Sequence, residues 1–240
     1  MALQNRRYVI ESVLIGVFLF AGLLGASYLV SSSIVNVKQM ERTVEVKGLS
    51  EREVPADIVI WPISFNIADN DLVNLYQTIE KQNAKVIDFL SAQGFTDDEI
   101  TVSTPAVVDK LAREYDSSYT SRFRYTANST ITVYTNQVDV ARDTMKKVVD
   151  LGREGIAIAG DSYSTQYIFS QLNQIKPEMI EEATRNARLA ADKFAKDSDS
   201  RLGKIKRANQ GTFSIEDRDS STAHIKKVRI VSTIEYYLSD

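Results

Sequence analysis

The stretch Val46–Phe65, "VKGLSEREVPADIVIWPISF", contains the pattern of the first two strands. A short run ending at Gly48 predicts one strand, and the β-branched and aromatic run "ADIVIWPISFNI" predicts the next. We expect Gly48 and Asp57 to be structural turn residues, because a carboxylate at the start of a strand can accept backbone hydrogen bonds and fix a turn. Pro62 cannot donate a ladder hydrogen bond, so the second strand is expected to be an edge strand or to be bulged there.

The composition of the 240-residue chain excludes several classes of protein. Its 29 Lys and Arg against 32 Asp and Glu give a net charge of −3, without the basic stripe of a nucleic-acid binder. There is no Cys and one His, which excludes thiol nucleophiles, disulfides and Cys-rich zinc sites. We therefore expect no nucleic-acid partner, no cofactor and no metal.

The N-terminal part of the chain has the pattern of a membrane anchor. Residues 12–30 are mostly apolar and uncharged, and their length nearly spans a bilayer core as a helix. Arg6 and Arg7 precede them, and positive residues stay on the cytoplasmic side. The sequence thus predicts a signal anchor over residues 1–37, a linker over 38–42, and a domain outside the cytoplasm over 43–240.

Two questions remain open for this segment: whether it is cleaved, and whether its small residues pack against another helix. A cleaved signal peptide would have a shorter apolar region followed by a small-residue site, for which Ser31–Ser33 is a weak candidate. Small residues four apart allow transmembrane helices to approach closely, but they are also common in such helices generally. The candidates for helix packing are Ala21, Gly22, Gly25 and Ala26.

Hydrophobic periodicity predicts the remaining elements of the domain. Leu72, Tyr76, Ile79, Val86 and Leu90 recur at helical spacing, with a cap expected at Asp69, Asn70 or Asp71 and an end at Gly94. Asn136 is expected to cap a second helix and Pro177 to open a third. From Ala56 to Ser170 the expected order is β-α-β-β-α-β, the ferredoxin-like order, followed by the third helix and two C-terminal strands. The predicted class is α+β with largely antiparallel sheet.

Few residues could carry chemistry, and none forms a complete catalytic motif. Asp57 has only Glu51 and Glu53 nearby in sequence, and both are expected to be solvated. "GDSYS", residues 160–164, lacks the final glycine of a hydrolase elbow, so Ser162 and the single His224 are not expected to form a nucleophile pair. We expect no enzyme activity.

Two features are candidates for contacts between copies of the chain. The third helix has a face of small residues that includes Ala183 and Ala187, although ordinary packing within the chain would explain that face equally well. The polar segment 111–122 contains Tyr115 and Tyr119, and tyrosines in loops are enriched at interfaces.

Three stretches in this order resemble the SIMPL family of bacterial extracytoplasmic proteins. They are the opening strand pair quoted above, the Ala-spaced helix "IEEATRNARLAADKFAKDSDSRLGKIKRA" and the closing strand "VRIVSTIEYYL". The resemblance covers about residues 43–238 and implies an α+β domain, ring- or channel-shaped homo-oligomers in some members, and a link to envelope or oxidative stress. Two departures are the apparent anchor and the triplet Gly48-Leu49-Ser50, where the family usually has Gly-x-Gly.

Together these features predict a single-pass protein of the bacterial inner membrane. Its N-terminus is expected in the cytoplasm and its domain in the periplasm or outside the cell. The leading hypothesis is a structural or envelope-stress role through self-assembly into a ring- or channel-like homo-oligomer, with the bilayer contacted by the N-terminal helix. The alternatives are a binding module for a peptide, lipid or envelope ligand, and, remotely, a serine hydrolase. No protein partner is indicated.

Overall fold

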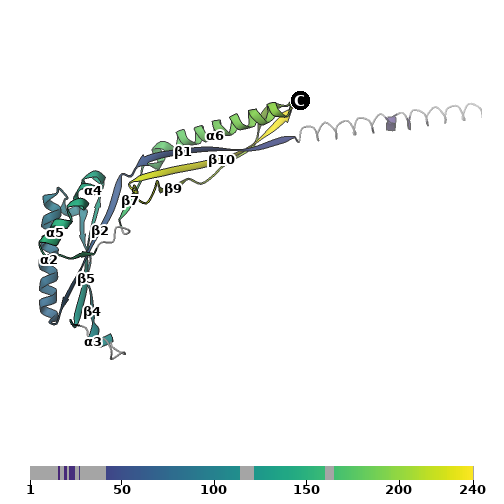
Figure 1. Ribbon diagram of the computed structural model, residues 1–240. Helices are drawn as coiled ribbons and strands as arrows, with labels where there is room; N and C mark the ends of the chain where they lie inside the picture. The colour runs from purple at the N-terminus through teal and green to yellow at the C-terminus, as the bar shows by residue number, and fades with distance from the viewer. Residues whose placement is uncertain are drawn as a thin grey trace, which may run out of the picture. The chain divides into compact units, whose positions relative to one another are not determined.

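The computed structural model describes residues 42–113, 122–159 and 165–239, together with a few isolated residues between 16 and 27. These residues form two antiparallel sheets with α-helices α2 to α6 (Figure 1), which confirms the predicted α+β class. The transmembrane segment predicted at about 12–30 lies mostly outside the described residues. Within the part that is described, no helix is long and apolar enough to cross a membrane.

The chain divides into two compact units, so the domain expected over residues 43–240 contains both of them. Unit 1 comprises residues up to 50, 177–213 and 230–240. Unit 2 comprises residues 51–176 and 214–229. Strands β1 (Thr43–Pro55) and β10 (Ile225–Ser239) and helix α6 (Leu172–Asp197) contribute residues to both units.

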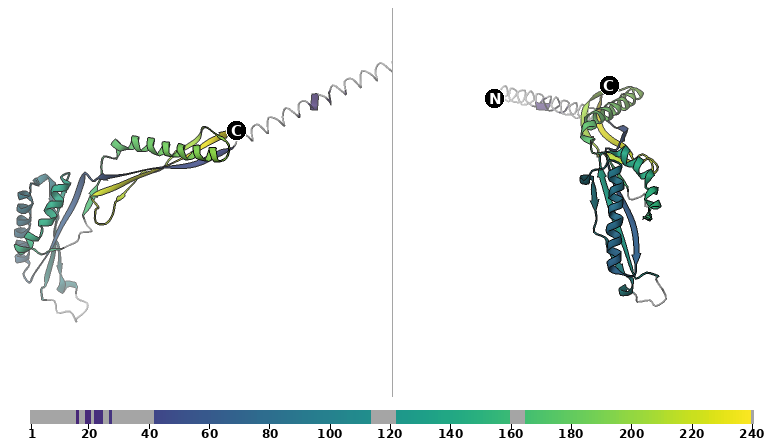
Figure 2. Two further views of the ribbon diagram at one scale, coloured as in Figure 1. Left: turned by 45° about the horizontal axis from the view of Figure 1, so that its top comes forward. Right: turned by 90° about the vertical axis from the view of Figure 1, so that its left-hand side faces the viewer.

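Unit 1 is a sheet covered by one helix. Its strands lie in the order β1-β10-β8, where β8 spans Arg201–Gln210. Helix α6 runs along the sheet in both side views (Figures 1 and 2) and buries a line of alanines against it. The core of unit 1 includes the cluster Val46, Ala187, Ala191, Ile234 and Tyr236.

Unit 2 is a second sheet with helices on one face. The long strands β2 (Ile58–Asp69) and β5 (Tyr125–Thr135) pair in the centre, in the order β3-β5-β2-β6. Helix α2 (Leu72–Ala92) covers the sheet together with the shorter α4 and α5 (Figure 2). The remaining elements of the chain are β3 (Ile100–Val102), β4 (Ala106–Asp109), α3 (Lys110–Arg113), α4 (Val138–Lys147), α5 (Val149–Arg153), β6 (Ile158–Ala159), β7 (Gln166–Ile168), β9 (Ser214–Asp217) and the short 3₁₀ helix Asp97–Glu99. Of these, β9 pairs with β10 and so belongs to the first sheet.

Strand β2 is central rather than an edge strand, which corrects the expectation from Pro62. On one side it pairs continuously with β5, and Pro62 lies opposite Thr132. On the other side residues 58–60 pair with β7 and residues 64–65 pair with β6. Residues 61–63 therefore have no described partner strand on that side. The missing N–H of proline is accommodated by an interruption in the neighbouring strands.

The ends of α2 confirm the sequence prediction, but its buried face differs. The Asp71 carboxylate accepts hydrogen bonds from the backbone N–H groups of Val73 and Asn74 at 2.8 and 2.9 Å, and Gly94 has a φ of +100°. Leu75 is fully buried, whereas Leu72 and Tyr76 remain 41% and 45% exposed. The buried stripe is therefore displaced by one position in the first turn.

Three other boundaries also differ from the expectations. Helix α4 begins at Val138, and the hydroxyl of Thr135 rather than Asn136 accepts the N–H of Gln137 at 3.0 Å. Pro177 lies inside α6, which starts at Leu172. The first C-terminal strand is split into β8 and β9 near Gly211, where a Cβ would lie 2.5 Å from the Val231 carbonyl oxygen.

Candidate functional site

The interruption beside Pro62 opens into a hollow of about 420 Å³ in unit 2. Its walls come from β2, α4, β6, β7 and the loop between β9 and β10. Trp61 and Ile63 reach it from the buried face of β2, since alternate residues of that strand point toward the helices. The volume falls within the range of about 300–1,000 Å³ that is typical of small-molecule sites.

Aromatic side chains form one wall of the hollow. The rings of Tyr167 and His224 meet edge to face, with centroids 6.0 Å apart and planes at 64°. The hydroxyl of Tyr167 donates to the thioether sulfur of Met145 at 3.7 Å. Because a thioether is a weak acceptor, this hydroxyl would donate more strongly to an oxygen acceptor placed in the hollow.

The electrostatics of the hollow favour a neutral histidine beside a cation. Burial lowers the pKa of His224, and the positive charges of Arg142 and Arg218 lower it further against the opposing effect of Asp139 and Asp219. Burial also raises the pKa of Tyr167. At neutral pH both rings are thus uncharged, and the Arg142 guanidinium supplies positive charge to the wall.

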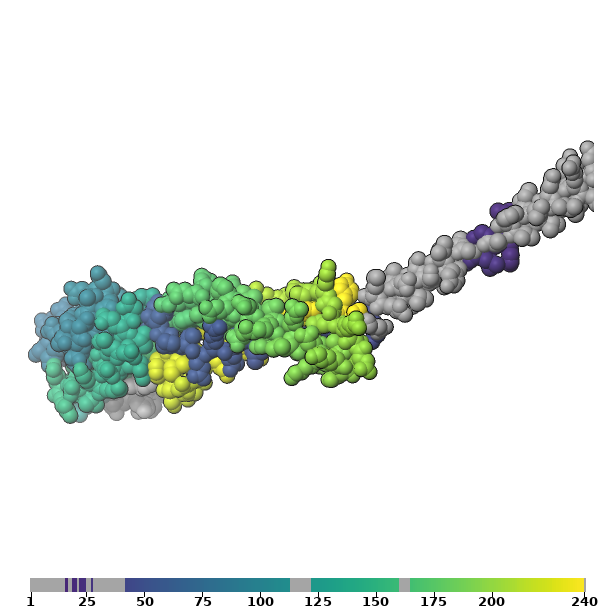
Figure 3. Space-filling view, turned by 90° about the horizontal axis from the view of Figure 1, so that it is seen from above, coloured from purple at the N-terminus to yellow at the C-terminus, as the bar shows by residue number. Residues whose placement is uncertain are grey.

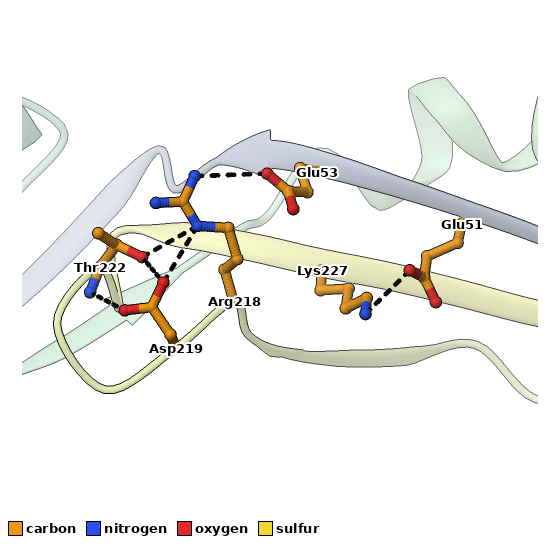
Figure 4. Close-up of polar contacts among 6 residues, drawn as sticks. All are labelled: Glu51, Glu53, Arg218, Asp219, Thr222 and Lys227. Atoms are coloured by element: carbon orange, nitrogen blue, oxygen red, sulfur yellow. Dashed lines mark hydrogen bonds and ion pairs between the residues drawn. The ribbon is translucent and has the colours of Figure 1, made fainter.

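The loop that carries His224 is fastened by one carboxylate (Figure 4). Asp219 accepts hydrogen bonds from the backbone N–H of Ser221 at 2.8 Å. It also accepts from the backbone N–H of Thr222 at 2.8 Å and from the Thr222 hydroxyl, as Figure 4 shows. The Arg218 guanidinium donates to Asp219 at 3.1 Å and to Glu53 of β1 at 3.4 Å. The Thr222 hydroxyl, and then Arg218, lower the pKa of Asp219 to about 2.

Beside this cluster, the ammonium of Lys227 lies 2.9 Å from the Glu51 carboxylate, as Figure 4 also shows. Glu51 and Glu53, which the sequence suggests are solvated, therefore each have a basic partner in unit 2. Both pairs are largely exposed, and exposed pairs contribute little to stability. They join β1 to the β9–β10 loop through Arg218 and to β10 through Lys227.

Asp57 links the beginning of β2 to the end of β7. Its carboxylate accepts hydrogen bonds from the backbone N–H of Ser170 at 2.8 Å and from the Ser170 hydroxyl at 2.9 Å. Its own N–H donates to the Ile168 carbonyl at 2.9 Å, and the N–H of Ala56 donates to the His224 carbonyl at 2.8 Å. The short link between β1 and β2 is thus tied to both sides of the hollow.

Gly48 lies within β1, because the strand continues to Pro55, so the expected turn at this position is wrong. A Cβ on Gly48 would lie 1.8 Å from the carbonyl oxygen of Ala183 and 2.5 Å from the nitrogen of Ala187. Asn186 also donates to the Leu49 carbonyl at 2.8 Å. The glycine is required by the close approach of α6 to the strand.

Ala183 and Ala187, proposed from the sequence as interface residues, are fully buried inside unit 1. They are therefore not available to contact a second copy. They pack within the chain, which was the alternative explanation of this face. The other sequence candidates Ala21, Gly25, Ala26, Tyr115, Tyr119 and Ser162 lie outside the described residues. Gly22 is helical, and a Cβ added to it would meet nothing within 4 Å among the described residues.

Sequence reasoning missed the hollow and its residues Arg142, Met145 and Tyr167. Two features of the sequence could have indicated it. Pro62 lies inside a strong strand pattern, and the strand pattern after residue 155 is interrupted. Among the described residues, no group of His, Asp or Glu could hold a metal ion.

The chain was compared with known protein families. Residues 44–229 match the family described as SIMPL, a protein of unknown function (DUF541). The chain belongs to the SIMPL family. The match begins in β1 and ends in β10, so it includes residues of both units and the whole hollow. None of the curated proteins matches this SIMPL chain.

Proposed function

We propose that this SIMPL protein is a membrane-anchored, extracytoplasmic protein that assembles into a closed homo-oligomer with a structural or envelope-stress role. The observation that carries the proposal is strand β8. It forms an edge of the unit 1 sheet, pairing with β10 and, among the described residues, with no other strand. Nine of its ten residues are exposed.

A long exposed edge strand is a ready template for pairing with another chain. Helix α6 forms the surface of unit 1 on the side seen in Figure 3, and its buried alanines pack on β1 and β10. Ile205 of β8 remains 49% exposed. A neighbouring chain would cover this apolar side chain and satisfy the open backbone groups of β8.

The charge of β8 favours one mode of pairing over another. The strand has four basic residues, Arg201, Lys204, Lys206 and Arg207, and no acidic residue. Like charges directly opposite one another destabilise a strand pair, so two β8 strands would pair poorly. Strand β1, at the other edge of the same sheet, has both an acid and a base, Glu45 and Lys47, on its exposed face, so it repels β8 less than a second β8 would. We therefore propose that β8 of one copy pairs with β1 of the next.

Pairing between two different edges is heterologous, and such contacts form rings when the rotation closes. The predicted anchor would hold every copy in one orientation on one membrane, which raises the effective concentration of weakly interacting domains. Both conditions suit cyclic symmetry about the membrane normal. We further interpret unit 2 as a ferredoxin-like split βαβ domain, supported by its antiparallel order β3-β5-β2-β6.

Thiol cross-linking tests this arrangement, because the chain has no cysteine of its own. The variant Lys47→Cys/Asn209→Cys places one thiol on β1 and one on β8, and a short bis-maleimide is added to membranes. We expect a ladder of cross-linked chains that ends at one size. Each single-cysteine variant should remain uncross-linked, as should the matched pair Val149→Cys/Asn209→Cys, whose first thiol lies on exposed α5.

Cross-linking of Asn209→Cys alone would indicate a symmetrical β8–β8 pair and contradict the head-to-tail proposal. A double variant that stays uncross-linked while its thiols react with a monofunctional maleimide would contradict assembly through these edges.

A further inference from the structure

The hollow beside Pro62 combines an apolar body with polar groups that have unused capacity. Trp61, Met145, Val148 and Ile158 supply apolar surface, and the same residues belong to or pack against the unit 2 core. Because that core is held by long strands and α2, the wall is largely preformed. A preformed apolar wall with a few polar groups is the usual construction of a small-molecule site.

Three polar side chains reach the hollow from separate elements. The Tyr167 hydroxyl comes from β7 and has the Met145 sulfur as its acceptor. The His224 ring comes from the turn directly before β10, where the Tyr167 ring meets it edge to face. Within the described part of the chain, its ring nitrogens have no hydrogen-bond partner. The imidazole can donate to an acceptor without breaking an existing hydrogen bond, whereas the phenol would exchange the weak acceptor sulfur of Met145 for a stronger oxygen acceptor.

Arg142 supplies the charge. One of its terminal nitrogens lies 3.3 Å from Asp139 on the preceding turn of α4. A guanidinium has five N–H donors, so this contact leaves several of them available. No carboxylate is among the described residues that line the hollow. The wall therefore favours an anionic group, and guanidinium binds carboxylates in a geometry that can use two hydrogen bonds.

We propose that this hollow is a binding site for a small carboxylate with an aromatic or compact apolar body. The carboxylate accepts hydrogen bonds from Arg142, Tyr167 and His224, and the body packs against Trp61 and Met145. This site lies wholly in unit 2 and is independent of the proposed assembly through β8 and β1 in unit 1.

Trp61 is the only tryptophan of the chain, so its fluorescence reports directly on this hollow. The full-length protein in mild detergent is titrated with phenylpropionate, and the neutral phenylpropionamide serves as the ligand control. We expect saturable quenching with the carboxylate and much weaker binding of the amide, since the amide carries no charge for Arg142.

Two variants identify the contacts. Arg142→Gln should weaken binding about tenfold or more, because a hydrogen bond to a charged group is lost, and Tyr167→Phe should weaken it about fivefold while keeping the ring. The matched control is Arg153→Gln, which removes a helix arginine paired with Asp150 in the same i,i+3 arrangement. That control should bind as the unchanged protein does.

Circular dichroism and unfolding curves establish that each variant is folded before its affinity is compared. Equal affinity for acid and amide, or an affinity that Arg142→Gln and Arg153→Gln reduce alike, would overturn the assignment of the carboxylate to Arg142. Absence of saturable quenching by phenylpropionate would overturn the site itself. Neither result would bear on the cross-linking of β1 to β8.

Discussion

Gly48 in β1 faces the carbonyl oxygen of Ala183 in α6 so closely that a Cβ at residue 48 would lie 1.8 Å from that oxygen. The same Cβ would lie 2.5 Å from the Ala187 nitrogen, so both obstructing atoms belong to the helix backbone. Ser50 and Leu49 add hydrogen bonds across this contact, to Glu182 at 2.8 Å and from Asn186 at 2.8 Å. Helix and strand are therefore locked at one separation in unit 1.

Replacing Gly48 with alanine should destabilise unit 1 strongly. The helix must move away from the strand, and such overpacking costs about 3 kcal/mol or more. The measurement is the free energy of unfolding in urea at matched temperature. Gly152→Ala is the control, since a Cβ there meets nothing within 4 Å and alanine stabilises a helix by up to about 1 kcal/mol. Equal stability of the two variants would refute the close approach.

Removing the Asp57 carboxylate should loosen the link between β1 and β2. Asp57→Ala loses the hydrogen bonds from the Ser170 N–H and hydroxyl, and we expect a cost of about 1–2 kcal/mol. Ser170→Ala removes the hydroxyl alone and should cost about half as much. A double-mutant cycle measured by urea unfolding separates the two. Additive effects of the two substitutions would show that the contact contributes nothing.

In acid, the β9–β10 loop should lose the hydrogen bonds that its backbone donates to the Asp219 carboxylate. The pKa of Asp219 is about 2 in the folded protein against an ordinary value of 3.8, so the folded state holds this carboxylate in its charged form. Its stabilising effect is complete above pH 3.8 and is lost as the pH falls toward 2. Protection of the Ser221 and Thr222 amides, corrected for intrinsic exchange, should fall across this interval.

The control for the acid prediction is Asp219→Asn, which cannot titrate. Its Ser221 and Thr222 amides should be weakly protected at every pH and show no further loss in acid. Protection that falls in the same interval in this variant would assign the transition to another carboxylate.

A pair of proline substitutions should distinguish the two edges of β8. Successive backbone N–H groups along a strand point to opposite sides, so only one of Ala208 and Asn209 donates toward β10. Proline at that position should destabilise the fold by about 1–3 kcal/mol. Proline at the other position removes an outward N–H and should reduce assembly while leaving the fold stable. If both variants assemble normally, β8 is not an assembly edge.

Local chemistry made part of the fold predictable from the sequence. The Asp71 cap, the Gly94 end and the strand predicted from the β-branched and aromatic run of β2 depend on neighbours in the chain, and the structure has all three. The structural effect of Pro62 was harder to predict, because it depends on where β6 and β7 stop pairing with β2. Gly48 was misjudged because a glycine suits both a turn and a close helix–strand approach, and only the packing of α6 distinguishes them.

The hollow depends on contacts between residues far apart in sequence. Trp61, Arg142, Tyr167 and His224 converge only through the antiparallel order of unit 2, and each alone has an ordinary interpretation as a core or surface residue. The exposed edge of β8 was equally hidden. Its residues fit a strand pattern, but the sequence does not state which strands lie at an edge.

The most direct test of the proposed assembly is the mass of the full-length protein in mild detergent, measured by size-exclusion chromatography with multi-angle light scattering. The bound detergent is subtracted from the mass of each particle. We predict one species whose protein mass is a fixed multiple of the chain mass and does not change on moderate dilution, as a closed ring requires. A protein that remains monomeric at concentrations well above those of the membrane extract would contradict the proposal.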